Sequence, residues 1–364
     1  MTKTFVIQKE ITFPKKDYKG KICLDPFMSI SIDLAGNVGL CSCGFWQPTK
    51  IGNIKNNSID EMLQSELAQR IRDSIRNSTY EYCDDSRCGL IINNQLTTVD
   101  MLDKTDSYNN SPSTYDRVMD TSVIARPRYF YIAGDIICNL SCPSCRTRVI
   151  AETPEQREGR TSVMSLLNQQ VFNGEDPRPI VVYLGAGGDM FASPLVLDFL
   201  KTFPLDRYPK TEFHFQTNGL LFKKRWDRIN HLRNNIVNVA ITIDSHLPDV
   251  YAKLRRGGNM ADIIENLNFI RELKQELDFK FSIRMVVQKD NYTEVKDFYD
   301  FVQQFDVTNV EFMRILNWGT YTPQEFAEID VLDPKHVDYE TAIFKFRELK
   351  MLHDDRVILY HFNI

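Results

Sequence analysis

The chain has 364 residues, of which 43% are hydrophobic and 26% are charged, and its formal net charge is −5. This composition is typical of a globular protein that is long enough for one large domain and a smaller one. The negative charge and the absence of long lysine or arginine runs exclude an obvious site for nucleic acid or an anionic membrane surface. We therefore expect a small molecule or a peptide as the partner.

The sequence also shows no membrane or secretion signal. No apolar run reaches the roughly 20 residues of a membrane span, and the polar start at residues 1–4 lacks a signal-peptide core. We therefore expect a cytoplasmic location. In a long chain of this kind, metal ligation explains the eight cysteines better than disulfide bonds do.

Residues 1–92 are predicted to form a small cysteine-rich α+β domain. Short strands at 30–33 and 38–41 flank a turn. Ser58 and Glu61 resemble a capping box that begins one amphipathic helix, whose apolar positions continue to Ile75.

Four cysteines of this domain can form a closed thiolate site, for either zinc or an auxiliary [4Fe–4S] cluster. They are Cys23, Cys41, Cys83 and Cys88, and Cys43 is an alternative ligand to Cys41. Four cysteine ligands by themselves do not choose between the two metals.

Residues 93–127 are polar and are predicted to be an interdomain linker, with a loop at 109–113. From residue 128 to residue 364, apolar strand-like runs alternate with helical patterns, which predicts a parallel sheet of right-handed crossover units. The predicted strands are 129–133, 180–184, 212–216, 237–243, 279–287 and 309–315, and the predicted helices include 194–202, 248–254, 261–277 and 293–305. The fold class is therefore α/β, an open partial barrel with its site at the carboxyl ends of the strands.

The first barrel strand is followed by Cys138, Cys142 and Cys145. Three thiolates leave one position of a metal site without a protein ligand. The motif has three possible interpretations: a [4Fe–4S] cluster with one open iron, a zinc site, or three unrelated core cysteines. Its place after the first strand of a repeating α/β pattern favours the cluster.

The loops after the next three strands bring further polar residues to the same edge. They contain Gly185–Asp189, Thr217–Gly219 and Asp244–His246. The glycine run is either a binding loop or a tight turn, and Asp189 is either a ligand contact or a helix N-cap.

With these motifs, residues 128–320 resemble the radical S-adenosylmethionine (SAM) enzymes. The resemblance implies that the three barrel cysteines bind three irons of a [4Fe–4S] cluster and that the methionyl group of SAM binds the fourth. Gly187, Gly188 and Asp189 stand where the family has a Gly-Gly-Glu-Pro element that contacts the methionyl amine, although Asp189-Met190 replaces Glu-Pro here. The other cofactor-binding residues that the resemblance implies are Asn218, Asp244, Ser245 and Arg284.

Residues 1–92 resemble the SPASM/twitch module of these enzymes. The resemblance rests on the Cys23–Cys41 spacing, the run 51–54 and the pair Cys83 and Cys88. It implies an auxiliary [4Fe–4S] cluster rather than zinc, and full cysteine ligation favours an electron carrier. The module usually follows the barrel, whereas here it precedes it, and its five cysteines complete only one four-cysteine cluster.

The resemblance implies reductive cleavage of SAM and abstraction of a hydrogen atom from a substrate, with an external one-electron donor such as flavodoxin or ferredoxin. The single auxiliary cluster favours oxidation of a small sugar, aminocyclitol or related molecule. Three alternatives stay open: a maturase of ribosomally synthesised peptides, a non-catalytic iron–sulfur electron-transfer protein, and a zinc-stabilised binding barrel. In the maturase, residues 1–20 and the linker would recognise the peptide.

A few further residues have two interpretations each. His214 and His246 lie near strand ends and either transfer protons or pack. The run Arg255–Gly258 is either a clamp for a carboxylate or a solvated turn. Trp318 either shapes the pocket or belongs to the core.

Overall fold

The protein is described by a computed structural model that covers residues 10–44, 46–106, 112–124, 126–150, 153–174, 178–185 and 187–360. The chain divides into two compact units. The first unit consists of Met1–Asp135, Glu152–Gly187 and Asp198–Phe213, and the second of Ile136–Ala151, Gly188–Leu197 and His214–Ile364. Each predicted site lies almost entirely within one unit.

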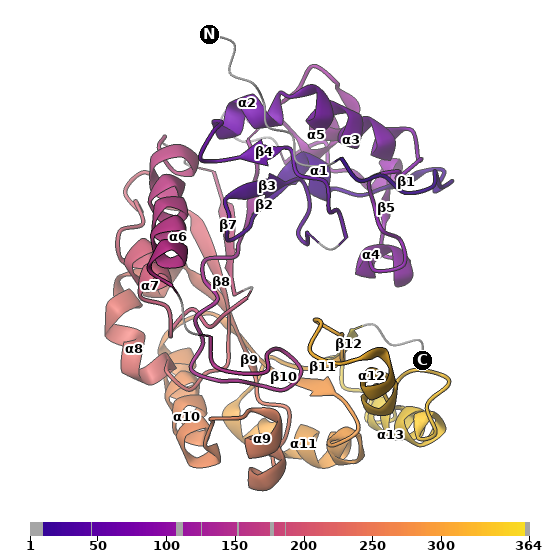
Figure 1. Cartoon of the computed structure of the whole chain (residues 1–364), viewed down its shortest axis with the longest axis vertical. Helices are drawn as coiled ribbons and strands as arrows, with labels where there is room; N and C mark the ends of the chain where they lie inside the picture. Colours follow the sequence, from indigo (N-terminus) through magenta and orange to yellow (C-terminus); the bar gives the residue numbers. More distant parts are fainter. Residues whose placement is uncertain are drawn as a thin grey trace. The chain divides into compact units, whose positions relative to one another are not determined.

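The first unit contains strands in the order β7-β6-β2-β3-β4 (Figure 1). Strand β2 (Ser29–Ile32) pairs antiparallel with β3 (Asn37–Gly39), which pairs antiparallel with β4 (Gly52–Asn53). On its other side, β2 pairs in parallel with β6 (Tyr129–Ile132), and β6 pairs in parallel with β7 (Ile180–Leu184). The N-terminal hairpin therefore shares a sheet with the first two predicted barrel strands.

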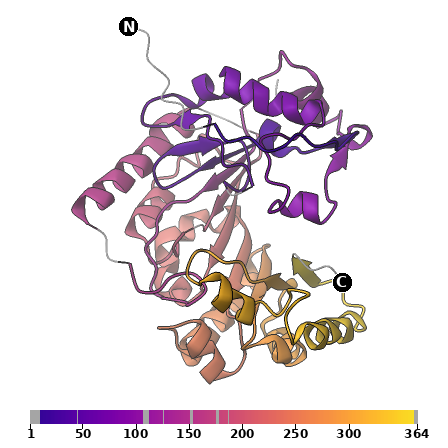
Figure 2. The same ribbon diagram turned by 45° about the vertical axis from the view of Figure 1, so that its right-hand side comes forward.

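Helices α2 (Ile59–Leu63) and α3 (Glu66–Arg76) lie on one side of this hairpin (Figures 1 and 2). The predicted capping box is present: Ser58 Oγ accepts from the Glu61 N–H at 3.2 Å, and the Ser58 N–H donates to the Glu61 carboxylate at 2.8 Å. The predicted single helix is interrupted, because Ser65 Oγ accepts the backbone N–H three residues later and begins a second helix.

The segment 93–127, predicted as a linker, contains β5 (Thr97–Thr98), the short 3-10 helix η1 (Val99–Met101) and α5 (Thr114–Met119). Strand β5 pairs antiparallel with β1 (Lys21–Ile22). The segment also contributes buried side chains to the hydrophobic cluster around Ile22 and Tyr80; these are Leu96, Leu102 and Val118. Residues 109–111 of the predicted loop lie outside the described residues.

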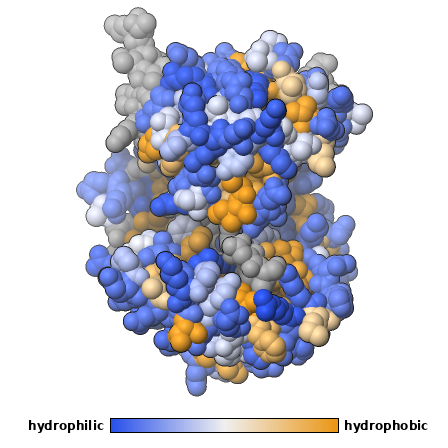
Figure 3. Space-filling view, turned by 90° about the vertical axis from the view of Figure 1, so that its right-hand side faces the viewer, coloured by the Kyte–Doolittle hydropathy of each residue, from blue (hydrophilic) through white to orange (hydrophobic). Residues whose placement is uncertain are grey.

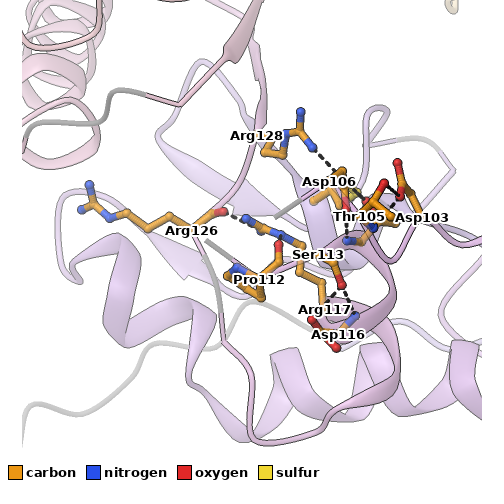
Figure 4. Close-up of polar contacts among 11 residues, drawn as sticks. Asp103, Thr105, Asp106, Pro112, Ser113, Asp116, Arg117, Arg126 and Arg128 are labelled. Carbon is orange, nitrogen blue, oxygen red and sulfur yellow. Dashed lines mark hydrogen bonds and ion pairs between the residues drawn. The ribbon is translucent and has the colours of Figure 1, made fainter. Parts of the chain in front are cut away.

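Polar contacts fix the end of this segment (Figure 4). The Asp106 carboxylate accepts from both the N–H and the hydroxyl of Thr114, at 2.7 and 2.6 Å, and pairs with Arg128 at 3.1 Å. Arg117 donates to the carbonyl oxygen of Arg126 at 2.9 Å. The segment is therefore packed onto the first unit by hydrogen bonds as well as by apolar contacts.

The second unit contains strands in the order β8-β9-β10-β11-β12, except that the first three residues of β8 belong to the first unit. These are β8 (Thr211–Thr217), β9 (Ile236–Thr242), β10 (Lys280–Val287), β11 (Asn309–Arg314) and β12 (Val357–Tyr360). Strands β9 to β12 pair in parallel. All six predicted barrel strands are present, each within one residue of its predicted bounds.

Among the described residues β12 pairs only with β11, so the sheet has an open edge there. The fold class is therefore confirmed as α/β with an open parallel sheet. Strand β12 was not predicted, because a run of four apolar residues has no clear period.

The remaining helices connect these strands. They are α1 (Asp25–Met28), α4 (Gly89–Ile92), α6 (Pro154–Leu166), α7 (Pro194–Lys201), α8 (Phe222–Ile229), α9 (Pro248–Leu254), α10 (Met260–Glu276), α11 (Val295–Val302), α12 (Pro323–Ile329) and α13 (Tyr339–Lys350).

In the second unit, α10 and α11 lie on one side of strands β9 to β11 (Figure 1). Alternate residues of these strands, such as Ile241, Ile283 and Phe312, are buried and apolar. The other face carries Arg284, whose partners in register are Thr242 and Glu311. Because side chains alternate along a strand, this polar face is the one available to a site.

The described part of the chain contains no helix that is both long and apolar enough to cross a bilayer. On the face drawn in Figure 3, apolar side chains form separate patches within a mainly hydrophilic surface.

Two phenylalanines of the second unit test its core. Phe312 is fully buried, whereas Phe344 is 55% exposed. We expect Phe312→Ala to lower the free energy of unfolding by about 3–5 kcal/mol, because it removes a buried ring and leaves a cavity. Phe344→Ala should change it by about 0.5 kcal/mol or less. Urea denaturation followed by circular dichroism measures both, and equal effects would contradict the assigned core.

Candidate functional site

The loop that carries Cys138, Cys142 and Cys145 belongs to the second unit and consists of turns and extended chain. Cys142 is buried, Cys138 is half-buried and Cys145 is exposed. The N–H groups of Cys145 and Arg146 both donate to the Cys142 carbonyl oxygen at 2.9 Å. This single turn brings the second and third cysteines of the motif close together.

Side chains from two other loops hold the beginning of the cysteine loop. The buried Asp189 carboxylate accepts from the Thr217 hydroxyl and the Asn218 N–H, both at 2.7 Å, and the Asp189 N–H donates to the carbonyl before Cys138 at 2.8 Å. The Asn218 amide lies 3.6 Å from Cys138 Sγ. Burial raises the pKa of Asp189, and these hydrogen bonds oppose that shift. Two of the predicted cofactor-binding residues thus lie beside the cysteine loop.

The predicted glycine element is only partly described. Gly187 is exposed and has a left-handed φ of +90°, which suits glycine, and Gly188 is half-buried. Ala186 lies outside the described residues. Gly187 ends a segment of the first unit, and Gly188 begins one of the second.

Asp244 and Ser245 follow β9, and both are buried. Ser245 Oγ donates to the Glu294 carboxylate at 2.6 Å, and His246 Nδ1 lies 3.3 Å from the same carboxylate. Burial raises the pKa of Glu294. The sequence did not single out Glu294, because it lies in the short 3-10 helix Tyr292–Glu294 and not in a recognisable motif.

The run Arg255–Gly258 begins with a turn after α9 in which Arg256 and Gly257 are exposed, and its two arginines contact the cysteine loop instead of forming an open clamp. Arg255 Nε lies 2.8 Å from the Asp244 carboxylate, and Arg255 Nη1 lies 3.7 Å from Cys142 Sγ. Arg256 Nε donates to Ser141 Oγ at 3.0 Å, and its carbonyl oxygen accepts from the Ser141 N–H at 3.0 Å. Both arginines therefore hold the cysteine loop.

Three other predicted residues lie elsewhere on the second unit. Arg284 forms an ion pair with Glu311 on the polar face of β10 and β11. Burial lowers the pKa of His214 to about 4, so this histidine is neutral at pH 7. Trp318 is 53% exposed in the loop after β11, which excludes a core position.

In the first unit, four cysteines line one cavity together with Asp25 and Tyr80; they are Cys23, Cys41, Cys83 and Cys88. Burial, and after it the neighbouring Cys88 thiol, raise the pKa of Cys83 to about 12. A buried thiol of this kind ionises only when a metal compensates its charge, so the donor set fits a group that binds four thiolates.

Cys43 is not among the residues that line this cavity. Asp25, which the sequence did not single out, accepts from the Ser42 N–H at 3.0 Å and from the Ser42 hydroxyl at 2.7 Å, and lies 3.6 Å from Cys41 Sγ. In the described part of the chain, no three Cys, His, Asp or Glu side chains are placed to bind a single metal ion. Each iron of a cubane cluster takes its own thiolate, so the ligands of a cluster surround a cavity.

The two segments that contain these cysteine sites each match the model of a known family. Residues 136–302 match the model of the radical SAM superfamily, and this match includes the three-cysteine loop. The chain therefore contains a radical SAM domain. Residues 23–89 match the model of the SPASM iron–sulfur cluster-binding domain, so a SPASM domain precedes the radical SAM domain in this chain. The two domains imply SAM, a SAM-binding [4Fe–4S] cluster and an auxiliary cluster as cofactors, rather than zinc.

Similar solved structures include Streptococcus suis SuiB with SAM (13% identity, TM-score 0.42, covering 68% of this chain and 55% of that chain). A second is native anSMEcpe with SAM (18% identity, TM-score 0.42, covering 62% of this chain and 61% of that chain). A third is SuiB with its precursor peptide SuiA (12% identity, TM-score 0.42, covering 93% of this chain and 72% of that chain). These likenesses are too low to transfer a substrate to this chain, which spans 55–61% of the first two proteins. No curated protein matches the chain.

Cysteine variants test the assignment of ligands to the two clusters. We expect about eight irons per reconstituted chain, which is two cubanes. Cys41→Ala should reduce the iron content to about four, whereas Cys43→Ala should retain about eight, because Cys41 lines the cavity and Cys43 does not. Iron analysis after anaerobic reconstitution measures both variants. The reverse outcome would show that Cys43 is the ligand.

Proposed function

We propose that this enzyme cleaves SAM at a cluster held by Cys138, Cys142 and Cys145 and removes a hydrogen atom from a substrate carbon. The observation that supports the proposal is the three-cysteine loop within the family match. Three ligands leave one iron for the methionyl group of SAM. The bound cluster would supply one electron to the sulfonium group of SAM.

The atoms and electrons of this reaction balance as follows. One electron from an external donor and one SAM give methionine and the 5′-deoxyadenosyl radical, which takes a hydrogen atom from the substrate and becomes 5′-deoxyadenosine. An oxidised product then requires the substrate to lose a proton and a second electron. We propose the auxiliary cluster as the acceptor of that electron, because its four cysteine ligands leave no iron for a substrate.

The residues of the chain have separate roles in this proposal. The Asp189 carboxylate accepts hydrogen bonds from the last residue of β8, from Asn218 after it and from its own loop, and so it holds Asn218 against Cys138. We propose that Gly187 and Gly188 approach the methionyl group through their backbone. We propose that the loop of Asp244 and Ser245 lies beside the ribose and that Arg284 belongs to the polar face of the sheet next to the cofactor.

We propose a peptide as the substrate, in preference to the sugar or aminocyclitol that the sequence favoured. Charged groups on β10 and β11 already pair: Arg284 with Glu311, and Arg314, at the end of β11, with Asp330 at 2.7 Å. The exposed side chains in the following loop are apolar, with Leu316 44% and Trp318 53% exposed. Exposed leucine and tryptophan suit an apolar peptide side chain, and tryptophan is enriched at such interfaces.

The first experiment tests the radical chemistry. The anaerobically reconstituted protein, reduced with dithionite, is expected to convert SAM to 5′-deoxyadenosine and methionine, which liquid chromatography measures. Replacing Cys138, Cys142 and Cys145 together with alanine should abolish both products while the auxiliary cluster remains. An iron-loaded wild-type protein that forms neither product would contradict the proposed function.

The second experiment tests the substrate class. Peptides encoded by genes beside this one, or a mixture of sugars and aminocyclitols, are added to the reduced enzyme with SAM. We expect the peptide to accelerate formation of 5′-deoxyadenosine and to lose hydrogen, as seen by mass spectrometry. Trp318→Ala should raise the KM for the peptide, whereas Phe344→Ala, at another exposed aromatic residue, should leave it unchanged. Acceleration by the sugars alone would refute the peptide assignment.

A further inference from the structure

A largely buried arginine side chain connects the cysteine loop to a fixed carboxylate. The Arg255 side chain is 13% exposed, and its partner Asp244 is 2% exposed. Arg255 follows the end of α9, and its N–H donates to the Tyr251 carbonyl oxygen at 2.7 Å. Its backbone is therefore anchored to a helix while its side chain reaches the cysteine loop.

The position of the Asp244 carboxylate is determined from several sides. Its Oδ1 accepts from the Val286 N–H at 2.8 Å, and its backbone carbonyl accepts from the Asn291 amide at 2.8 Å. Asp244 also has a left-handed φ of +65°, a conformation that persists only where the surroundings hold it. The carboxylate is thus a rigid support for the Arg255 guanidinium.

The other end of the guanidinium faces a cluster ligand. Arg255 Nη1 lies 3.7 Å from Cys142 Sγ, within hydrogen-bonding range of sulfur. In a cluster this sulfur is a thiolate, and its negative charge increases when the cluster accepts an electron. Hydrogen bonds to cluster sulfurs and nearby charge set the reduction potential.

We propose that Arg255 is a positioning residue that raises the reduction potential of the SAM-binding cluster. Its positive charge and its hydrogen bond to Cys142 Sγ favour the reduced cluster, which is more negative by one charge. Asp244 fixes the direction of the guanidinium. This inference depends on the cluster and is independent of the substrate.

Arg256 provides a matched comparison on the same turn. Its Nε contacts Ser141 Oγ at 3.0 Å, and its Nη2 donates to the Thr147 carbonyl oxygen at 3.0 Å. Arg256 therefore contacts the cysteine loop only through neutral oxygen atoms in these two bonds, whereas Arg255 contacts the sulfur of a proposed cluster ligand. The two arginines therefore separate a mechanical effect from an electrostatic one.

The experiment measures the reduction potential of one cluster in the full chain with SAM. Cys83→Ala and Cys88→Ala remove the auxiliary cluster from every sample, so the electron paramagnetic resonance signal of the reduced protein reports only the other one. Arg255→Met should lower the equilibrium constant for one-electron reduction at least tenfold, which is a shift of about 59 mV to more negative potential. Arg255→Lys, which retains the charge but not the planar fork, should shift it less. Arg256→Met should leave the potential near that of the parent.

Arg255→Met leaves the Asp244 carboxylate buried without its partner, which can destabilise the protein. A second variant, Arg255→Met with Asp244→Asn, removes both charges and should still show the lower potential, because the donor to Cys142 is lost. Unchanged potentials in iron-loaded Arg255 variants would overturn the proposal, and so would an equal shift in Arg256→Met. Loss of the cluster from both Arg255 variants would assign Arg255 a purely structural role. Each of these outcomes differs from failure of SAM cleavage in the iron-loaded wild-type protein.

Discussion

The loop from Cys138 to Cys145 is held by hydrogen bonds from other loops rather than by regular secondary structure of its own. Asp189 and Asn218 fix its beginning, and Arg256 fixes its middle through Ser141. Asp189 and Asn218 come from the loops after β7 and β8, whereas Arg256 follows α9. The proposed cluster site depends on this constraint, since its three thiols must be held in a defined geometry to bind a cluster.

The two cysteine sites differ in how completely the protein surrounds the metal. In the SPASM domain, four cysteines line one cavity, whereas the barrel loop supplies three, one of them exposed. Full ligation suits electron transfer, and incomplete ligation leaves room for a reactive ligand. Charged side chains follow the same division: Asp25 lies near Cys41, and Arg255 lies near Cys142. An anion near one site and a cation near the other would separate the potentials of the two clusters.

Hydrophobic periodicity predicted the strands well, because each barrel strand alternates or is fully apolar and is bounded by polar loops. Local signals also predicted the Ser58 capping box, but the same pattern hid the helix break at Ser65, whose cap competes with helix continuation. The pairing of β2 with β6 was not predictable, because it joins residues a hundred positions apart. The same limit applied to Glu294, Asp25 and the roles of Arg255 and Arg256, whose partners come from distant segments of the chain.

The central claim is that the three-cysteine loop leaves one cluster iron for the methionyl group of SAM. Electron–nuclear double resonance of the reduced protein with SAM labelled at the methionyl amine with ¹⁵N and at the carboxylate with ¹⁷O tests this directly. Our account predicts hyperfine coupling of both labels to the cluster, and loss of both couplings when Cys138, Cys142 and Cys145 are replaced by alanine. A reduced, iron-loaded protein that binds SAM without either coupling would contradict it.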